Sequence, residues 1–126
     1  MSKPGTLTKL RDQIHQELGP ISILINNAGV VFGGEFEQVP LEKHLATFKV
    51  NSEGLMACTH TFMDDLIRAP RGHLVNIASA SAFIGLPYGS SYAASKWAVV
   101  GFSESLRLEL AERGIRNVKV TTVCPS

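Results

Sequence analysis

The sequence predicts an α/β fold with a partial, doubly wound parallel sheet of about three strands and flanking helices. Short apolar runs at residues 21–25, 73–78 and 118–123 alternate with longer segments whose apolar residues recur at helical spacing. Strands that alternate with helices favour parallel pairing through right-handed crossovers. Three strands are few for a doubly wound sheet, so the chain is expected to form about half of one.

The composition is that of one globular domain. The 126 residues are 44% hydrophobic, and 12 Lys and Arg against 11 Asp and Glu give a net charge of +1. This balance gives no electrostatic reason to expect nucleic acid as a partner. Cys58, Cys124 and the four histidines do not stand at metal-ligand spacing, so we expect no metal site and two packing thiols.

The first two elements are a helix and a strand. Leu7, Leu10, Ile14 and Leu18 recur at helical spacing, which predicts an amphipathic helix over residues 6–18 that ends at 19–20. The apolar run at 21–25 is typical of a strand that is buried on both faces.

A long helix is expected over residues 41–68. Pro40 suits its start, and Gly54 is expected to weaken it locally. Its expected apolar side consists of Leu45, Phe48, Leu55, Phe62, Leu66 and Ile67.

The rest of the chain repeats the alternation. Residues 73–78 are the second predicted strand, 91–113 a helix with Gly114 as its C-terminal cap, and 118–123 the last strand. The apolar stripe of the 91–113 helix is Val99, Phe102, Leu106 and Leu110.

Four polar residues suggest proton transfer to or from an alcohol oxygen. Ser79 lies thirteen residues before Tyr92, Lys96 lies four after it, and Asn51 lies further upstream. A tyrosine with a pKa near ~10 is a poor base at neutral pH, and a nearby ammonium lowers that pKa. Because residues i and i+4 share a helix face, the spacing places Lys96 beside Tyr92.

Polar or turn-forming residues also follow the predicted strands. Asn26 and Ser79 come directly after two of them, and Pro125 follows the third. Because the carboxyl ends of parallel strands meet at one edge, where open α/β sheets bind ligands, we expect these residues to lie near one another.

These residues together resemble the short-chain dehydrogenase/reductase family, from about residue 6 to the end of the chain. One such motif is weak, but all of them stand in the family's order and spacing. The matching segments are Asn26-Asn27-Ala28-Gly29, Asn51 within 50–54, Ser79 closing 75–79, Tyr92-xxx-Lys96, and Pro125.

The resemblance implies a role for each polar residue and a partial Rossmann-like fold. Tyr92 would be the general acid/base and Ser79 would polarise the substrate carbonyl. Lys96 would bind the nicotinamide ribose and lower the pKa of Tyr92. Asn51 would hold a water that relays protons from Lys96. The cofactor would be NAD or NADP, and its site would comprise Asn26, Ala28, Gly29, Tyr92, Lys96 and Pro125.

The chain departs from the family pattern in two places. The family's glycine-rich phosphate loop has no counterpart here, because Gly29, Gly33 and Gly34 follow what resembles the fourth family strand. Ser126 stands where the family usually has glycine. We therefore interpret residues 1–126 as a partial domain without the N-terminal nucleotide-binding half, and expect weak cofactor binding by this chain alone.

Two functional hypotheses follow. The first is an NAD(P)-dependent oxidoreductase that interconverts an alcohol and a ketone or aldehyde, with a hydrophobic substrate suggested by the apolar loop between Ser79 and Tyr92. The alternative is a non-catalytic fragment or isoform that acts as a dimerisation module through the two long helices, a pairing that the family also implies. No secretory signal or membrane span is evident in the sequence, so a cytoplasmic protein is expected.

Overall fold

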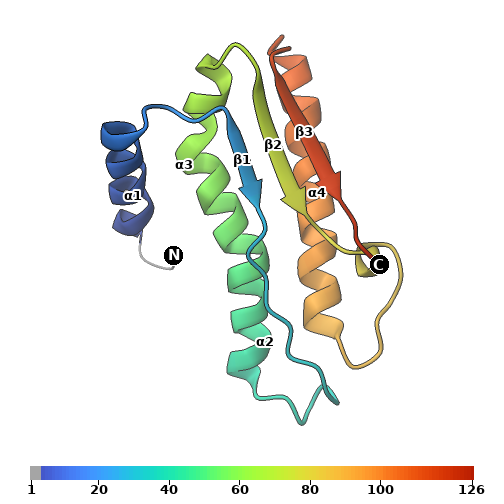
Figure 1. The fold of residues 1–126 in the computed structure, drawn as a ribbon. Coiled ribbons are helices and arrows are strands. Elements are labelled where there is room, and N and C mark those ends of the chain that lie inside the picture. The colour runs from blue at the N-terminus through green and yellow to red at the C-terminus, as the bar shows by residue number, and fades with distance from the viewer. Residues whose placement is uncertain (1–3) are drawn as a thin grey trace.

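The computed structural model describes residues 4–126, in which three parallel strands lie against a layer of helices (Figure 1). The predicted α/β fold with a small parallel sheet is therefore confirmed. Two elements, η1 and η2, are a π-helical turn and a 3₁₀ turn. The elements are α1 (Pro4–Glu17), β1 (Ile23–Asn26), α2 (Leu41–Phe48), η1 (Lys49–Gly54), α3 (Leu55–Arg68), β2 (Gly72–Ile77), η2 (Ala80–Ala82), α4 (Ser90–Glu112) and β3 (Val118–Val123).

The sheet has the order β1-β2-β3, with both neighbouring pairs parallel. Ile23 stands opposite His73, and Gly72 stands opposite Val118. All three carboxyl ends consequently lie at one edge of the sheet, as the alternation of elements predicted.

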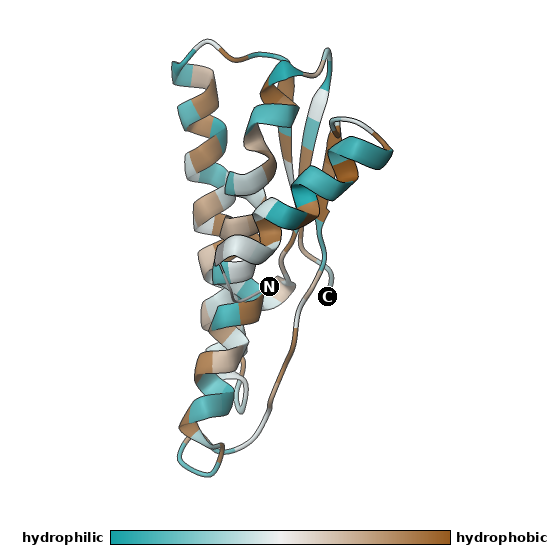
Figure 2. Cartoon of the chain, turned by 90° about the vertical axis from the view of Figure 1, so that its left-hand side faces the viewer, coloured by the Kyte–Doolittle hydropathy of each residue, from teal (hydrophilic) through white to brown (hydrophobic). Residues whose placement is uncertain are grey.

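The core lies between the sheet and the helices α3 and α4. Leu66, Leu74, Leu110 and Val118 are buried there in one cluster. Burial of each leucine side chain contributes about 1.5–3 kcal/mol relative to exposure. Figure 2 shows this layering from the side, with polar and apolar residues mixed along the helices. No helix within residues 4–126 has both the length and the apolar character needed to cross a membrane.

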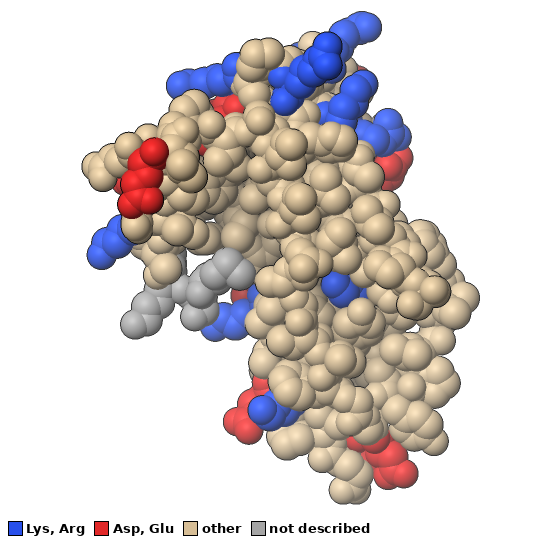
Figure 3. Space-filling view, in the orientation of Figure 1, with Lys and Arg blue, Asp and Glu red and all other residues tan. Residues whose placement is uncertain are grey.

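The opposite face of the sheet is open, which corrects the expectation of a strand buried on both faces. Ile23 and Ile25 of β1 are each 59% exposed. Burial alternates along β2, so one face packs on helices and the other is only half covered. No described helix lies over this side of the sheet (Figure 1), and Figure 3 shows it as a largely uncharged surface. An apolar run alone could not distinguish one covered face from two.

The π-helical turn η1 interrupts the long helix that was predicted over residues 41–68. Its wider turn rotates α2 relative to α3, by about 100° for one extra residue. Thr47 is consequently buried in α2, whereas Leu45 is 61% exposed and Phe48 is also exposed. The prediction that Leu45 and Phe48 continue the apolar side of Leu55 and Phe62 was wrong for this reason.

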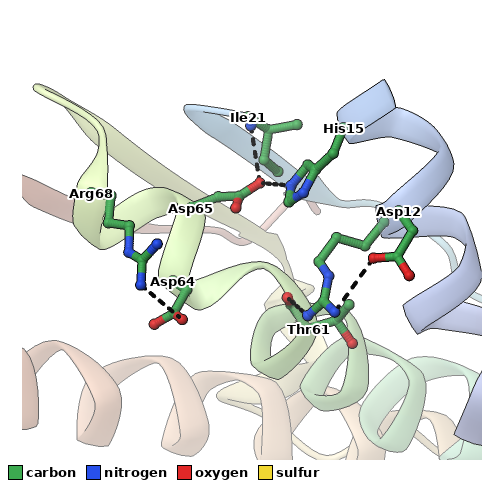
Figure 4. Close-up of polar contacts among 8 residues, drawn as sticks. Asp12, His15, Ile21, Thr61, Asp64, Asp65 and Arg68 are labelled. Atoms are coloured by element: carbon green, nitrogen blue, oxygen red, sulfur yellow. Dashed lines mark hydrogen bonds and ion pairs between the residues drawn. The ribbon is translucent and has the colours of Figure 1, made fainter. Parts of the chain in front are cut away.

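A buried carboxylate holds α1 against α3 (Figure 4). Asp65 Oδ2 accepts a hydrogen bond from the backbone N–H of Ile21 at 3.0 Å and lies 2.7 Å from His15 Nε2. Arg11 adds a weaker bond to the carbonyl of Thr61 at 3.4 Å. These contacts fix both the helix and the connection that leads from it into β1.

The two cysteines are half-buried and form no disulfide. Cys58 lines a cavity of about 280 Å³ between α1, β1 and α3. Burial raises the pKa of its thiol above the ordinary value. Both positions agree with the prediction of packing thiols.

Glycine closes α4, as the sequence predicted. Gly114 has a φ of 74°, a conformation that glycine adopts without steric penalty. Its N–H bonds to the carbonyl of Ala111 at 3.0 Å, and the N–H of Ile115 bonds to that of Leu110 at 2.9 Å. These bonds satisfy carbonyls at the end of the helix before the chain enters β3.

We expect the substitution Gly72→Ala to lower the free energy of unfolding by about 1–3 kcal/mol. A Cβ at Gly72 would stand 2.3 Å from the carbonyl oxygen of Leu66, so the backbone of α3 or β2 has to move. Urea unfolding measures the effect. The control is Gly101→Ala on α4, where a Cβ meets nothing within 4 Å and about 0.5–1 kcal/mol of stabilisation is expected. Equal effects of the two substitutions would contradict the close approach at Gly72.

Candidate functional site

The carboxyl edge of the sheet brings together the segments that were singled out in the sequence. Asn26 is the last residue of β1, and Ser79 and Pro125 each stand two residues after the ends of β2 and β3. The last two segments are tied by backbone bonds: the N–H of Ala78 bonds to the carbonyl of Val123 at 2.7 Å and that of Ala80 to the carbonyl of Pro125 at 2.8 Å. The expected meeting of strand ends is thus observed.

Asn51 ties the loop after β1 to α4. It lies in η1 and is only 1% exposed. Its Oδ1 accepts from the N–H of Val30 at 2.8 Å, and its Nδ2 donates to the carbonyl of Val30 at 2.9 Å and to Ser95 Oγ at 3.0 Å. The amide therefore binds a backbone segment much as a β-strand partner does, and one lone pair of Oδ1 is left for another donor.

Lys96 is buried beside Asn51 and Tyr92. The residue is only 4% exposed. Its Nζ donates to the carbonyl of Ile77, the last residue of β2, at 3.0 Å. Nζ also lies 5.7 Å from the centroid of the Tyr92 ring. A Cβ on Gly29 would stand 3.5 Å from Nζ and 3.4 Å from Asn51 Oδ1. The backbone of Gly29 therefore passes close to both side chains. The predicted proximity of Tyr92 and Lys96 is observed.

Ser79, two residues after β2, and Tyr92, on α4, are the other two predicted catalytic residues. Tyr92 is half-buried in the first turn of α4. Ser79 Oγ accepts bonds from the N–H of Ser81 at 3.2 Å and from Ser81 Oγ at 2.9 Å. The hydroxyl proton of Ser79 thus remains available to a further acceptor. Within the described chain, no hydrogen bond joins Ser79 to Tyr92.

Several residues that support the site were not found from the sequence. Ser95 is fully buried; its hydroxyl donates to the carbonyl of Tyr92 at 2.7 Å and accepts from Asn51. Asn76 is also fully buried, and its Oδ1 accepts from Asn26 Nδ2 at 2.9 Å. The inward position of residue 76, two residues after Leu74 and two before Ala78 in the predicted strand 73–78, was a signal available in the sequence.

The four residues of the 26–29 segment divide into buried and exposed. Asn26 is buried, and its Nδ2 donates to Thr59 Oγ1 at 3.0 Å as well as to Asn76. Asn27, Ala28 and Gly29 are exposed. Asn26 therefore has a structural hydrogen-bonding role, and Ala28 and Gly29 are the exposed members of the predicted cofactor site in this segment.

The loop between β1 and α2 lies beside the loop between η2 and α4. The N–H of Gly34 donates to the carbonyl of Tyr88 at 2.9 Å. Tyr88 has a φ of 63°, a conformation that disfavours residues with a side chain. The loop before Tyr92 is thus held in a strained conformation, a feature that concentrates at ligand sites. Its exposed apolar side chains are Phe83, Ile84, Leu86 and Tyr88.

Burial lowers the pKa of the Lys96 ammonium below its ordinary value, because desolvation penalises the charged form. At pH values below the pKa of Lys96 in the folded chain, Lys96 is protonated in both the folded and the unfolded chain, and the folded chain is destabilised by the desolvation of its ammonium. As the pH rises through that folded-state pKa, the folded chain releases the Lys96 proton before the unfolded chain does. The free energy of unfolding therefore increases. We expect urea titrations between pH ~7 and ~10 to show this gain relative to Lys96→Met. A difference that falls or stays constant with pH would contradict the desolvation of Lys96.

Comparisons with known proteins agree with this arrangement. The family model described as short chain dehydrogenase matches residues 1–126. Epidermal retinol dehydrogenase 2 of Mus musculus is 38% identical over 124 residues, which are 98% of this chain and 40% of that protein. Estradiol 17-beta-dehydrogenase 11 of Homo sapiens is 36% identical over 114 residues, 90% of this chain and 38% of that protein.

Solved structures show the same similarity in three dimensions. The ligand-free aldohexose dehydrogenase of Thermoplasma acidophilum has a TM-score of 0.89 at 31% identity. The match covers 98% of this chain and 47% of the dehydrogenase chain. The apo form of LigO from Sphingobium sp. strain SYK-6 has a TM-score of 0.88 at 32% identity, with 98% and 45% covered. The chain thus spans less than half the length of these relatives. Its sequence and fold show that it belongs to the short-chain dehydrogenase family.

Proposed function

We propose that this chain carries the catalytic centre of an NAD(P)-dependent oxidoreductase that interconverts an alcohol and a ketone or aldehyde. The observation that carries the proposal is the buried ammonium of Lys96, which lies beside the Tyr92 ring at the carboxyl edge of the sheet. An ammonium has three N–H donors, and the carbonyl of Ile77 takes one of them. Two donors are left for the hydroxyl groups of a ligand.

The side chains suit a proton transfer at this edge. The phenol of Tyr92 gives a proton to the carbonyl oxygen in reduction and takes one from the alcohol in oxidation. The hydroxyl of Ser79 polarises the same oxygen with the proton that its Ser81 contacts leave available. Asn51 retains one Oδ1 lone pair for a water between Lys96 and solvent. The hydride chemistry belongs to a nicotinamide cofactor.

Part of the chain fits such a cofactor. The unused Lys96 donors and the exposed backbone of Gly29, which passes close to Lys96 Nζ, suit a ribose. The sequence contains no glycine-rich loop that leads from a strand into a helix, the usual site for a pyrophosphate. The ribose and nicotinamide contacts are therefore proposed for these residues, and NAD and NADP are equally compatible with them.

A hydrophobic substrate is favoured. The relatives include a retinol dehydrogenase and an estradiol dehydrogenase. The loop before Tyr92 presents the exposed side chains of Phe83, Ile84 and Tyr88. Apolar side chains in such a position suit an apolar alcohol or ketone.

The proposed activity is tested by incubating the chain with a hydrophobic ketone and millimolar NADH or NADPH. Oxidation of the reduced cofactor is followed by its absorbance, and the alcohol product is measured separately. Product formation that requires cofactor and Tyr92 supports the proposal. Binding of cofactor without any turnover over a panel of ketones, aldehydes and alcohols would contradict it.

We expect the isolated chain to bind NADH and NADPH more weakly than micromolar. Without backbone donors arranged around the pyrophosphate, ribose contacts alone provide the affinity. Isothermal titration calorimetry measures the dissociation constant for each cofactor. Micromolar affinity for either one would show that the phosphates find donors in these 126 residues.

A second candidate function is self-association through the outer face of α3 and α4. Met56 of α3 is exposed there, and it lines, with Phe102 and Leu106 of α4, a groove of about 720 Å³ between α1, α3 and α4. Large apolar side chains on a helical surface favour burial against another polypeptide. Light scattering over a range of concentrations is expected to show dimers that Met56→Ala weakens. A monomer at every concentration would remove this candidate.

A further inference from the structure

Outside the Tyr92 site, a serine hydroxyl lies against a histidine ring. Ser91, in the first turn of α4, contacts His44 of α2 through Oγ and Nδ1. His44 Nε2 lies 2.9 Å from the carbonyl oxygen of Phe36. A carbonyl only accepts hydrogen bonds, so Nε2 carries the proton and Nδ1 of the neutral ring is an acceptor. The hydroxyl of Ser91 therefore donates to His44.

The histidine ring is held in this orientation from two sides. The ring of Phe36 stacks on it with centroids 4.6 Å apart and an interplanar angle of 27°. The loop that carries Phe36 is itself fixed by the bond from the Gly34 N–H to the carbonyl of Tyr88, three residues before Ser91. Nucleophile, base and a third group that orients the base are thus present, which is the arrangement that activates a serine.

Other buried serines of the helices are bonded differently. The hydroxyls of Ser52, Ser95 and Ser103 donate to backbone carbonyls at 3.0, 2.7 and 2.7 Å. A carbonyl oxygen is too weak a base to take up the proton of a hydroxyl, whereas a neutral imidazole is a general base. The contact with His44 therefore distinguishes Ser91 from the serines whose hydroxyls donate only to the backbone of the helices.

We propose that Ser91 is a nucleophile that accepts an acyl group from a carboxylic ester, with His44 as its general base. Oγ attacks the ester carbonyl carbon while its proton passes to His44 Nδ1. The C–O bond to the leaving group then breaks, and the departing alkoxide takes the proton from His44 and leaves as the alcohol. The products are Ser91 acylated at Oγ and one alcohol, with no change of oxidation state and no cofactor.

The surroundings favour a small or apolar acyl group. Ser91 is half-buried, and the ring of Phe36 beside His44 is exposed. Because α4 begins at Ser90, the first N–H groups of this helix have no acceptor within it. They lie near the serine, where negative charge develops on the ester oxygen during attack.

The test is acetylation by p-nitrophenyl acetate in the absence of nicotinamide cofactor. Release of p-nitrophenol gives the rate, and mass spectrometry of the intact chain and its peptides gives the site. We expect one acetyl group on Ser91, its loss in Ser91→Ala, and a rate at least about 100-fold lower in His44→Ala that added imidazole restores. Ser90→Ala, which changes the exposed neighbouring serine, should react as the native chain does.

Two results would overturn the proposal. One is acetylation at the native rate in Ser91→Ala, or an acetyl group mapped to another residue. The other is an unchanged rate in both His44→Ala and His44→Phe, of which the second keeps an aromatic ring against Phe36. Circular dichroism and thermal unfolding of each variant separate a lost nucleophile from a lost fold.

Discussion

Tyr92→Phe is expected to lower kcat for ketone reduction by about 10²–10⁴-fold, the range that a positioned acid/base contributes. The substitution removes one hydroxyl and keeps the ring, which is half-buried and lies 5.7 Å from Lys96 Nζ. The packing of α4 is therefore retained, and the change falls on proton transfer. Initial rates at saturating ketone and fixed cofactor measure it, with thermal unfolding to confirm that the fold persists.

The matched control is Tyr88→Phe, the same chemical change on the other tyrosine of the chain. Tyr88 is exposed, and it is the backbone carbonyl of Tyr88 that accepts the bond from the N–H of Gly34, so its hydroxyl is not required for the proposed proton transfer. We expect its kcat to stay within about threefold of the native value, a difference of less than 1 kcal/mol in activation energy. Equal losses in the two variants, or full activity in Tyr92→Phe, would refute the role proposed for Tyr92.

Asn51→Ala is expected to lower the free energy of unfolding by about 3 kcal/mol, because it leaves three polar groups without their partner. These groups are the N–H and carbonyl of Val30 and the oxygen of the Ser95 hydroxyl, which loses its donor and keeps only its own bond to the carbonyl of Tyr92. The loop after β1 then loses its attachment to α4, and Gly29 moves relative to Lys96. Urea unfolding followed by circular dichroism gives the stability, and the proposed activity should fall with it.

Ser52→Ala provides the control for Asn51. Ser52 neighbours Asn51 in η1, is equally buried, and makes one bond, from its hydroxyl to the carbonyl of Ser95 at 3.0 Å. Its loss is expected to lower the free energy of unfolding by about 1 kcal/mol. If both substitutions were equally mild, the bridge from Asn51 to Val30 would not hold the loop.

Much of the fold could be predicted from the sequence because its signals are local. The last strand, 118–123, was predicted with the bounds that are observed, and the 91–113 helix differs by one residue at each end. Periodicity and the turn residues around Gly72 and Gly114 determine these elements. Tyr92 and Lys96 were brought together correctly for the same reason, since i+4 spacing within one helix decides their proximity.

The remaining features depend on contacts between distant residues. Asn51 and Ser95 are 44 residues apart, and Asn26 and Asn76 are 50 apart. No local pattern specifies such partners. The sequence therefore predicted that Asn51 holds a water, and it did not predict the two bonds of Asn51 to the backbone of Val30. The π-helical turn η1 likewise has no local pattern that specifies it, and it decides which side of α2 is buried.

The open sheet face has a calorimetric consequence. A compact monomer of 13.6 kDa has a solvent-accessible surface of about 6,600 Å². The folded chain exposes 7983 Å², about a fifth more, and part of the excess is the uncovered side of β1 with Ile23 and Ile25. Unfolding therefore hydrates less new apolar surface than usual. The heat-capacity increment should fall below the common value of about 12–15 cal/mol/K per residue, and the stability curve should be correspondingly flat with temperature.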